Sequence, residues 1–195
     1  MSATTRARIL KAVDQLLFER SAQFFSVRQV AQLAGVAPSL VIRHFRSKDE
    51  LVFLAVTARM AGDGANELAG LAQAGAFPRF ADLVAHLVAL DMTNGTRTRD
   101  LMSMSWWWME CEEDIFQAAV KSRQDLALAL LAKEMPADCP PEVLADLHEV
   151  LGLLYTGCLR HALARRIDAG LAAVGVNSRL ARVIAQARTA LGASH

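Results

Sequence analysis

Basic, hydroxyl and apolar side chains follow one another between residues 38 and 44 of this 195-residue chain, in the order Pro-Ser-Leu-Val-Ile-Arg-His. Arg43 has the forked donors that bind a guanine edge bidentately, and Leu40 or Pro38 can contact a thymine methyl group. The Ser39 hydroxyl and the His44 imidazole can hold a phosphate. These residue types are therefore suited to contact with duplex DNA.

The flanking sequence predicts a rigid support for these side chains. Ala31 is small enough for a close crossing of two short helices, and Gly35 tolerates the positive φ that a tight turn between them needs. Pro38 suits the first turn of the second helix, and Val41 and Phe45 recur four apart on the face that must be buried. A helix-turn-helix is expected, whose recognition helix turns these residues toward the major groove: Pro38, Ser39, Leu40, Ile42, Arg43 and His44.

Another helix is expected to begin at Lys48. Ser47 and Glu50 have the spacing of a capping box, in which the Ser47 hydroxyl accepts from the Glu50 amide. The Glu50 carboxylate is then expected to accept from the Ser47 amide.

Several positions of this stretch stand in one register: Ser26, Val30, Ala31, Ala34, Gly35, Val36, Phe45, Ser47, Lys48 and Leu51. This order closely resembles the N-terminal domain of the TetR family of bacterial transcriptional regulators. The motif covers about the first quarter of the chain, and the remainder agrees in length and helical character. The resemblance implies an all-α fold with an N-terminal three-helix DNA-binding domain and a C-terminal helical domain for ligand binding and dimerisation.

The resemblance also implies roles for residues around the recognition helix. Arg28, at the start of the preceding helix, is expected to reach a base or a phosphate. Ser26 and Lys48 are expected to fix the DNA backbone, and the helix N-terminus at Lys48 also favours an anion. Family members pair through their last two helices and usually repress, which implies a homodimer that binds a palindromic operator in double-stranded DNA and is released by a small-molecule effector.

Three positions depart from the family pattern. Ala37 stands where a Ser or Thr helix cap is frequent, which should cost about 1 kcal/mol of local helix stability. Ile42 replaces a frequent Tyr on the DNA face, so a phosphate-binding hydroxyl gives way to a group suited to a methyl. Ser21 stands where a Gly often follows the first helix. The operator sequence therefore cannot be inferred from relatives.

Charge is distributed unevenly along the chain. Residues 1–60 hold nine basic and four acidic side chains, a balance of +5, whereas residues 61–195 hold twelve and sixteen, a balance of −4. A basic N-terminal region on an acidic remainder is suited to binding DNA phosphates through the N-terminal region alone. The alternative is that the uneven charges are merely solvated. No signal region or membrane-length apolar run occurs, so a cytoplasmic location is expected.

Helical periods without a strand pattern predict two domains, residues 1–47 for DNA binding and residues 48–195 for effector binding and dimerisation, with the helix from Lys48 as connector. Breaks between helices are expected at residues 62–64, 75–78, 93–95, 136–141 and 175–178, where Gly, Pro or Asn occur.

The segment 142–168 is apolar on more than one face and, with the closing helix 178–191, is expected to form a four-helix interface in a dimer. The alternative is that these faces meet only within one monomer. The candidate interface residues are Leu144, Leu151, Cys158, Leu180, Ile184 and Leu191.

An aromatic and methionine stripe on the helix around residue 105 consists of Met102, Trp106 and Met109. Two interpretations stay open: ordinary core packing, or the lining of an effector cavity for an apolar or aromatic molecule. The cavity is expected between this helix and the segments 83–90 and 143–154.

Motifs for catalysis, nucleotide binding and metal binding do not occur, so neither enzymatic activity nor a cofactor or metal is expected. Cys111, Cys139 and Cys158 lack a C-x-x-C spacing, and neither a disulfide framework nor a zinc site is expected. The alternative function is a helical enzyme or small-molecule carrier in which the N-terminal motif is only structural.

Overall fold

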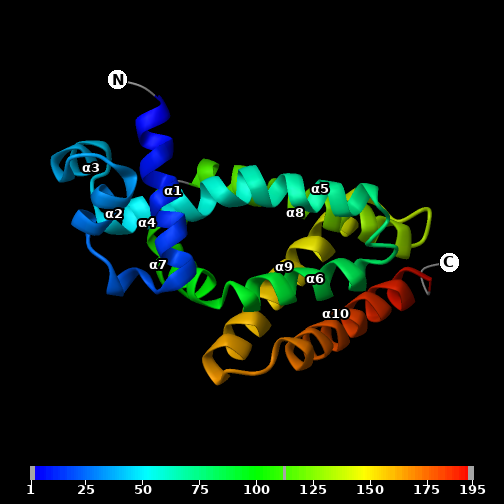
Figure 1. Cartoon of the computed structure of the whole chain (residues 1–195). Coiled ribbons are helices and arrows are strands. Elements are labelled where there is room, and N and C mark those ends of the chain that lie inside the picture. Colours follow the sequence, from blue (N-terminus) through cyan, green and yellow to red (C-terminus); the bar gives the residue numbers. More distant parts are fainter. Residues whose placement is uncertain (1–2, 112, 193–195) are drawn as a thin grey trace. The chain divides into compact units, whose positions relative to one another are not determined.

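The computed structural model describes the backbone of residues 3–111 and 113–192 and the side chains of residues 4–103 and 114–192. Within these ranges no strand occurs, and the predicted all-α fold is confirmed (Figure 1). The elements are α1 (Ala3–Glu19), η1 (Ala22–Phe24), α2 (Val27–Ala34), α3 (Pro38–His44), α4 (Lys48–Arg59), η2 (Met60–Gly64), α5 (Ala65–Gln73), α6 (Phe80–Thr93), α7 (Gly95–Cys111), α8 (Glu113–Glu134), α9 (Pro141–Arg165) and α10 (Ala169–Gly192).

The chain divides into two units, each with its own core. Unit 1 comprises residues 1–66 and 94–121, and unit 2 comprises residues 67–93 and 122–195. Helices α4 and α7 therefore pack in the same unit as the helix-turn-helix, although the sequence-based boundary follows residue 47. The functional division at that boundary stays a prediction.

Helix α4 occupies the centre of unit 1. All side chains from Glu50 to Thr57 are buried, because α1 and α7 both pack against this helix. The Thr57 hydroxyl is satisfied inside the helix by the Phe53 carbonyl oxygen, at 2.9 Å. The expected connector is therefore a core element of the unit that carries the helix-turn-helix.

A partly buried ionic cluster ties α7 to α1 and α4. Arg97 is 7% exposed, and its Nη2 lies 3.0 Å from Asp14 Oδ1 and donates to the Asp14 carbonyl oxygen at 2.7 Å. Arg97 Nη1 donates to Asn94, and Arg59 lies 3.7 Å from the second Asp14 carboxylate oxygen. Burial lowers the pKa of the Arg97 guanidinium. One carboxylate on α1 thus balances arginines from two other helices.

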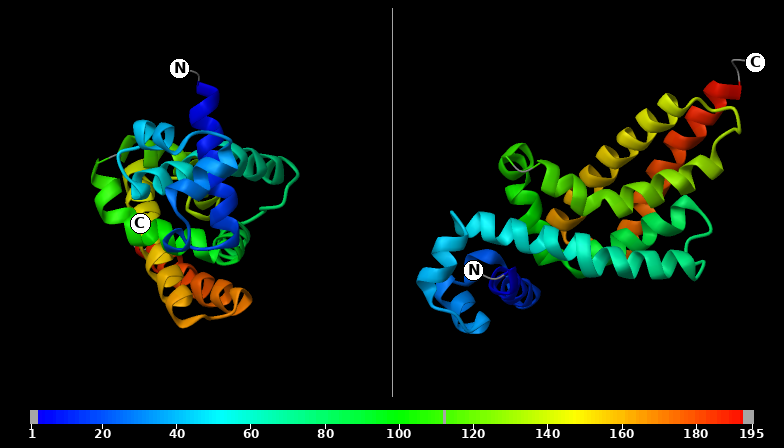
Figure 2. Two further views of the ribbon diagram at one scale, coloured as in Figure 1. Left: turned by 60° about the vertical axis from the view of Figure 1, so that its left-hand side comes forward. Right: turned by 90° about the horizontal axis from the view of Figure 1, so that it is seen from above.

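Two expected breaks are not breaks in the structure. Residues 62–64 lie in η2, a π-helical turn, so the glycines there loosen the helix without ending it. Residues 175–178 lie inside α10, a continuous helix that is coloured orange to red in Figures 1 and 2. Val176 and Leu180 are buried against unit 2, and this burial outweighs the roughly 1 kcal/mol cost of a helical glycine.

The real break before α10 falls at residues 166–168. Arg166 ends α9 in the left-handed region, with φ 55°. The Asp168 carboxylate then accepts from the amides of Gly170 and Leu171, at 2.8 and 3.3 Å, and so caps the first turn of α10. An Asp followed by a small-residue helix was the sequence signal for this boundary.

Unit 2 is built on α6, which packs against α9 and α10. A polar cluster crosses this apolar core: the Tyr155 hydroxyl donates to Asp91 Oδ2 at 2.7 Å, and Arg123 Nη1 lies 3.3 Å from Asp91 Oδ1. Burial, and then the nearby Asp91 charge, raise the pKa of Tyr155 well above its usual value. This cluster connects α6, α8 and α9.

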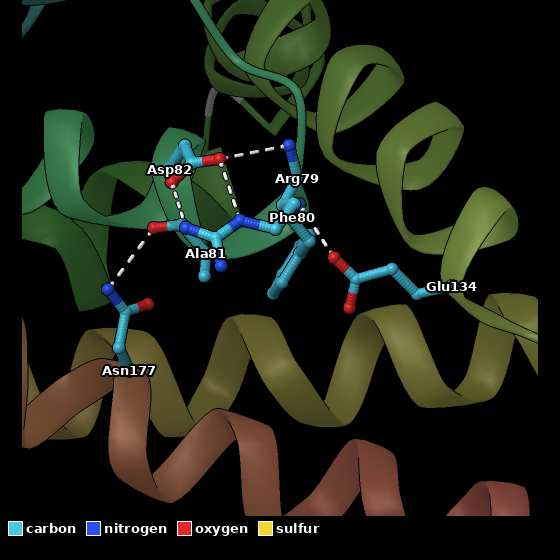
Figure 3. Close-up of polar contacts among 6 residues, drawn as sticks. All are labelled: Arg79, Phe80, Ala81, Asp82, Glu134 and Asn177. Atoms are coloured by element: carbon cyan, nitrogen blue, oxygen red, sulfur yellow. Dashed lines mark hydrogen bonds and ion pairs between the residues drawn. The ribbon is translucent and has the colours of Figure 1, made fainter.

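The start of α6 is fastened by side chains from both near and far in the sequence (Figure 3). Asp82 accepts from the Arg79 amide at 3.0 Å and from its guanidinium at 2.8 and 3.1 Å, and the hydrogen bond from this guanidinium lowers the pKa of Asp82. The first amide of the helix, at Phe80, donates to Glu134 on α8, at 2.9 Å, and Asn177 on α10 donates to Ala81 at 3.1 Å.

We expect Glu134→Ala to lower the free energy of unfolding by about 1 kcal/mol, the usual effect of removing a helix N-terminal acceptor. Urea denaturation measures this loss. Glu149→Ala is the matched control, because Glu149 is exposed on α9 and the same change there removes no such contact. Equal losses in both variants would contradict a capping role for Glu134.

Candidate nucleic-acid interface

Helix α2 begins with a complete capping box. The Ser26 hydroxyl accepts from the Gln29 amide at 3.3 Å, and the Gln29 side chain accepts from the Ser26 amide at 2.8 Å. Sequence reasoning missed this box, although the S-x-x-Q spacing was its signal. The box fixes where the first helix of the helix-turn-helix begins.

The predicted positive φ is present at Gly35, with φ 63° and ψ 44°. The Val36 amide donates to the Ala31 carbonyl oxygen at 2.9 Å and closes the turn. Arg8 of α1 donates to the carbonyl oxygens of Ala34 and Gly35. A Cβ atom on Gly35 would lie 3.0 Å from the Arg8 guanidinium, so both the backbone angle and the available space favour glycine.

The recognition helix α3 is oriented as the sequence predicts. Val41 is 1% exposed and Phe45 4%, and both pack into the core of unit 1. The opposite face is exposed and presents Pro38, Ser39, Ile42 and Arg43, while Leu40 and His44 are half-buried. Ile42, at 68% exposure, is a large apolar side chain held in solvent at the middle of this face.

His44 faces the protein more than the sequence suggests. Its Nε2 is enclosed and has no hydrogen-bond partner among the described residues, and its ring lies 6.1 Å from the Phe45 ring. In this conformation Nε2 cannot reach a phosphate. The predicted contact would need the other ring nitrogen or a rotation of the side chain.

Ser26 and Lys48 both serve the fold. The Ser26 hydroxyl belongs to the capping box, and the Lys48 ammonium donates to the Phe25 carbonyl oxygen and lies 4.8 Å from the centre of the Phe25 ring. Lys48 thereby fastens the start of α4 to the loop before α2. Arg28 is exposed at the start of α2. Phosphate contacts by these three residues stay predictions.

The expected capping box at Ser47 is only half present. The Ser47 hydroxyl accepts from the Glu50 amide at 3.0 Å, as predicted. The Glu50 carboxylate, however, binds the Arg46 amide and, at 3.1 Å, the Arg46 side chain, instead of the Ser47 amide. Arg46 offers a backbone donor and a cationic donor together, and this pair outcompetes a single neutral amide.

The candidate dimer residues lie in the core of unit 2. Leu151, Leu180 and Ile184 are buried, and Leu144, Cys158 and Leu191 are half-buried against them. Their apolar faces thus contact one another within the chain, and a role of these residues at a dimer interface stays a prediction. The large apolar side chains that α9 and α10 expose are Val150, Leu153, Leu171 and Val174.

Of the candidate effector residues, Met102 is half-buried on α7, and the side chains of Trp106 and Met109 lie outside the described residues. Among the side chains described, no group of three or more His, Cys, Asp or Glu is arranged to hold a metal ion. No helix in the described ranges is long and apolar enough to cross a membrane.

Comparison with known proteins agrees with this geometry. The model of a family described as bacterial regulatory proteins, tetR family, matches residues 9–55. A TetR transcriptional regulator from Rhodococcus sp. RHA1 has a similar fold, with a TM-score of 0.63 and 16% identity over 94% of each chain. NalD, the secondary repressor of the MexAB-OprM multidrug efflux pump in Pseudomonas aeruginosa, gives 0.53 and 19% identity over 92% of this chain and 94% of its own.

A helix-turn-helix with an exposed recognition helix, in an all-α chain, defines a DNA-binding transcription regulator. The family match covers the helix-turn-helix, and the shared fold extends along nearly the whole chain. Residues 9–55 thus match the TetR family of bacterial regulatory proteins, and the fold of the chain is similar to that of TetR regulators.

The uncapped start of α3 gives a stability prediction. Ala37 has the extended backbone of an N-cap residue, with φ −69° and ψ 141°, but supplies no side-chain acceptor. Ala37→Ser should raise the free energy of unfolding by about 1 kcal/mol. Ala69→Ser, at an exposed position inside α5, should lower it slightly. Thermal or urea unfolding measures both, and an Ala37 variant no more stable than the parent would count against the N-cap assignment.

Proposed function

We propose that this regulator acts as a repressor: a homodimer binds a palindromic operator through two copies of α3, and a small-molecule effector releases it. The observation that carries the proposal is the exposed face of α3, held rigidly by the Gly35 turn on one side and by buried Val41 and Phe45 on the other. A rigid helix with an exposed arginine and an exposed apolar side chain suits a major groove.

In this proposal the exposed residues of α3 divide the work by chemistry. Arg43 donates to guanine. Ile42 contacts thymine methyl groups, because this contact removes its exposed apolar side chain from water. Ser39, near the start of the helix, binds phosphate, as does Arg28 at the start of α2. Pro38 and Leu40 complete the contact with methyl groups.

The proposed dimer uses the outer faces of α9 and α10. Leu153 and Val174 are 68% and 65% exposed, and a Cβ atom on Gly157 would meet no other atom within 4 Å, so another helix can approach closely there. The exposed charges of α9 also change sign along its length, from acidic near the start to basic near the end: Glu142, Asp146, Glu149, Arg160 and Arg165. When a two-fold axis places two such helices side by side and antiparallel, the acidic part of each lies beside the basic part of the other.

An effector can release the protein only if it binds the non-DNA-binding state more tightly. We propose that it is apolar or aromatic and binds the C-terminal helical domain, with Met102, Trp106 and Met109 as candidate contacts. NalD, one of the proteins with this fold, is a repressor of a multidrug efflux pump. A repressor released by apolar small molecules is consistent with that likeness.

Replacement of Arg43 should lower the sequence specificity of DNA binding, whereas replacement of Lys48 should lower the affinity for every sequence. Arg43→Ala should reduce the ratio of operator to random-duplex affinity, since a bidentate base contact is worth about 1–3 kcal/mol. Lys48→Ala should weaken binding to all sequences. It should also lower the slope of log K against log salt by the equivalent of about one phosphate contact per bound helix-turn-helix. Fluorescence anisotropy at several salt concentrations measures both. An equal loss for operator and random duplex in Arg43→Ala would refute the base contact.

Lys48→Ala also tests the bond to Phe25. If this bond is the only role of Lys48, the variant unfolds more easily but keeps the parent salt slope. Absence of any salt-dependent duplex binding in the parent protein would favour the alternative function, a helical enzyme or carrier.

Dimerisation gives a further prediction. Leu153→Lys should yield a monomer at micromolar concentration in sedimentation, because two charges would be buried at the two-fold axis. Phe24→Lys is the matched control: Phe24 is 65% exposed in unit 1, and the same change there should leave the dimer intact.

The operator tests the same dimer from the side of the DNA. Inserting about five base pairs between the half-sites turns one half-site to the opposite side of the duplex and should abolish tight binding. Unchanged affinity for the lengthened site, or a dimeric Leu153→Lys protein, would overturn this arrangement.

A further inference from the structure

Arg6 of α1 lies beside the end of the recognition helix. Its side chain is exposed, and its Cζ atom lies 5.6 Å from the centre of the Phe45 ring. Phe45 directly follows α3 and is itself 4% exposed. A cation outside the helix-turn-helix is therefore held against the last turn of α3 by contact with an aromatic ring.

The charge of Arg6 is not neutralised within the described part of the protein. Other arginines of unit 1 have partners: Arg8 binds the carbonyl oxygens of the turn, Arg46 pairs with Glu50, and Arg59 faces Asp14. No side-chain hydrogen bond or ion pair joins Arg6 to a described residue, and its guanidinium lies over the Phe45 ring. A ring positions a guanidinium without cancelling its charge.

The geometry of a guanidinium allows two contacts at once. Its flat face rests on the ring, and its N–H groups point outward in the plane, where they can donate bidentately to a phosphate. When α3 lies in a major groove, the sugar-phosphate backbones flank it on both sides. A cation held at the last turn of α3 is then near one of these backbones.

We propose that Arg6 binds a backbone phosphate beside the groove occupied by α3, and that α1 thus supplies a DNA contact outside the helix-turn-helix. The assignment rests on the proposed function. Arg6 contributes affinity for any duplex and no sequence preference, because phosphate oxygens are the same at every base pair. The competing role is structural, in which Arg6 only covers the Phe45 ring.

Salt dependence separates the two roles. On a short random-sequence duplex, Arg6→Gln should lower the slope of log K against log salt by about 0.9 for each helix-turn-helix that binds. Arg6→Lys should keep most of the slope, since the charge remains. Lys11→Gln removes the same charge from an exposed position of the same helix, more than a third of a turn round from Arg6, and should keep the parent slope.

Urea denaturation of the same variants completes the test. If Arg6→Gln has the parent slope and only unfolds more easily, Arg6 is structural and the proposal is overturned. If Arg6→Gln and Lys11→Gln lose slope equally, the effect is one of net charge and the proposal is likewise overturned. A parent protein with no salt-dependent duplex binding would instead overturn the proposed function itself.

Discussion

The left-handed turn at Gly35 is the constraint on which the rest of the DNA-binding surface depends. Its φ of 63° lets α2 end and α3 begin within three residues, and so it decides which face of α3 is buried. Arg8 holds this turn from α1 by donating to the carbonyl oxygens of Ala34 and Gly35. Burial of Val41 and Phe45 follows, and the exposure of Arg43 and Ile42 is its consequence.

The basic residues of unit 1 show how few of its charges are left for a ligand. Arg8, Lys48 and Arg97 bind backbone carbonyl oxygens, and Arg46 and Arg59 face carboxylates. The sequence count of +5 over residues 1–60 therefore overstates the phosphate-binding surface. Exposure and partners, more than net charge, indicate which cations are available to DNA.

Local chemistry made the helix-turn-helix predictable. A positive-φ turn requires glycine, and Val41 and Phe45 lie four residues apart on one helix face. Both signals extend over only a few residues, so they can be recognised in the sequence. The DNA contacts themselves follow only in part: His44 and Lys48 have the right chemistry, but their orientation depends on Phe45 and Phe25, which lie in the core.

Tertiary partners explain what the sequence did not reveal. Residues 175–178 resemble a break, yet Asn177 binds a carbonyl oxygen of α6 and its neighbour Val176 is buried. Periodicity identified Leu151 and Leu180 as apolar faces but not their partners, which belong to the same chain. Leu153 and Val174 are the apolar residues that stay exposed after this core has formed, so they can be identified only from the folded structure.

The ion pair between half-buried Asp14 and buried Arg97 limits how this protein can be cut or recombined. A fragment that stops after α4 would leave Asp14 facing Arg59 alone and would expose the α4 surface that α7 covers. A chimaera that gives another regulator the DNA specificity of this chain must therefore also carry residues 94–121. The stability of the unit that presents the recognition helix thus depends on a helix far along the sequence.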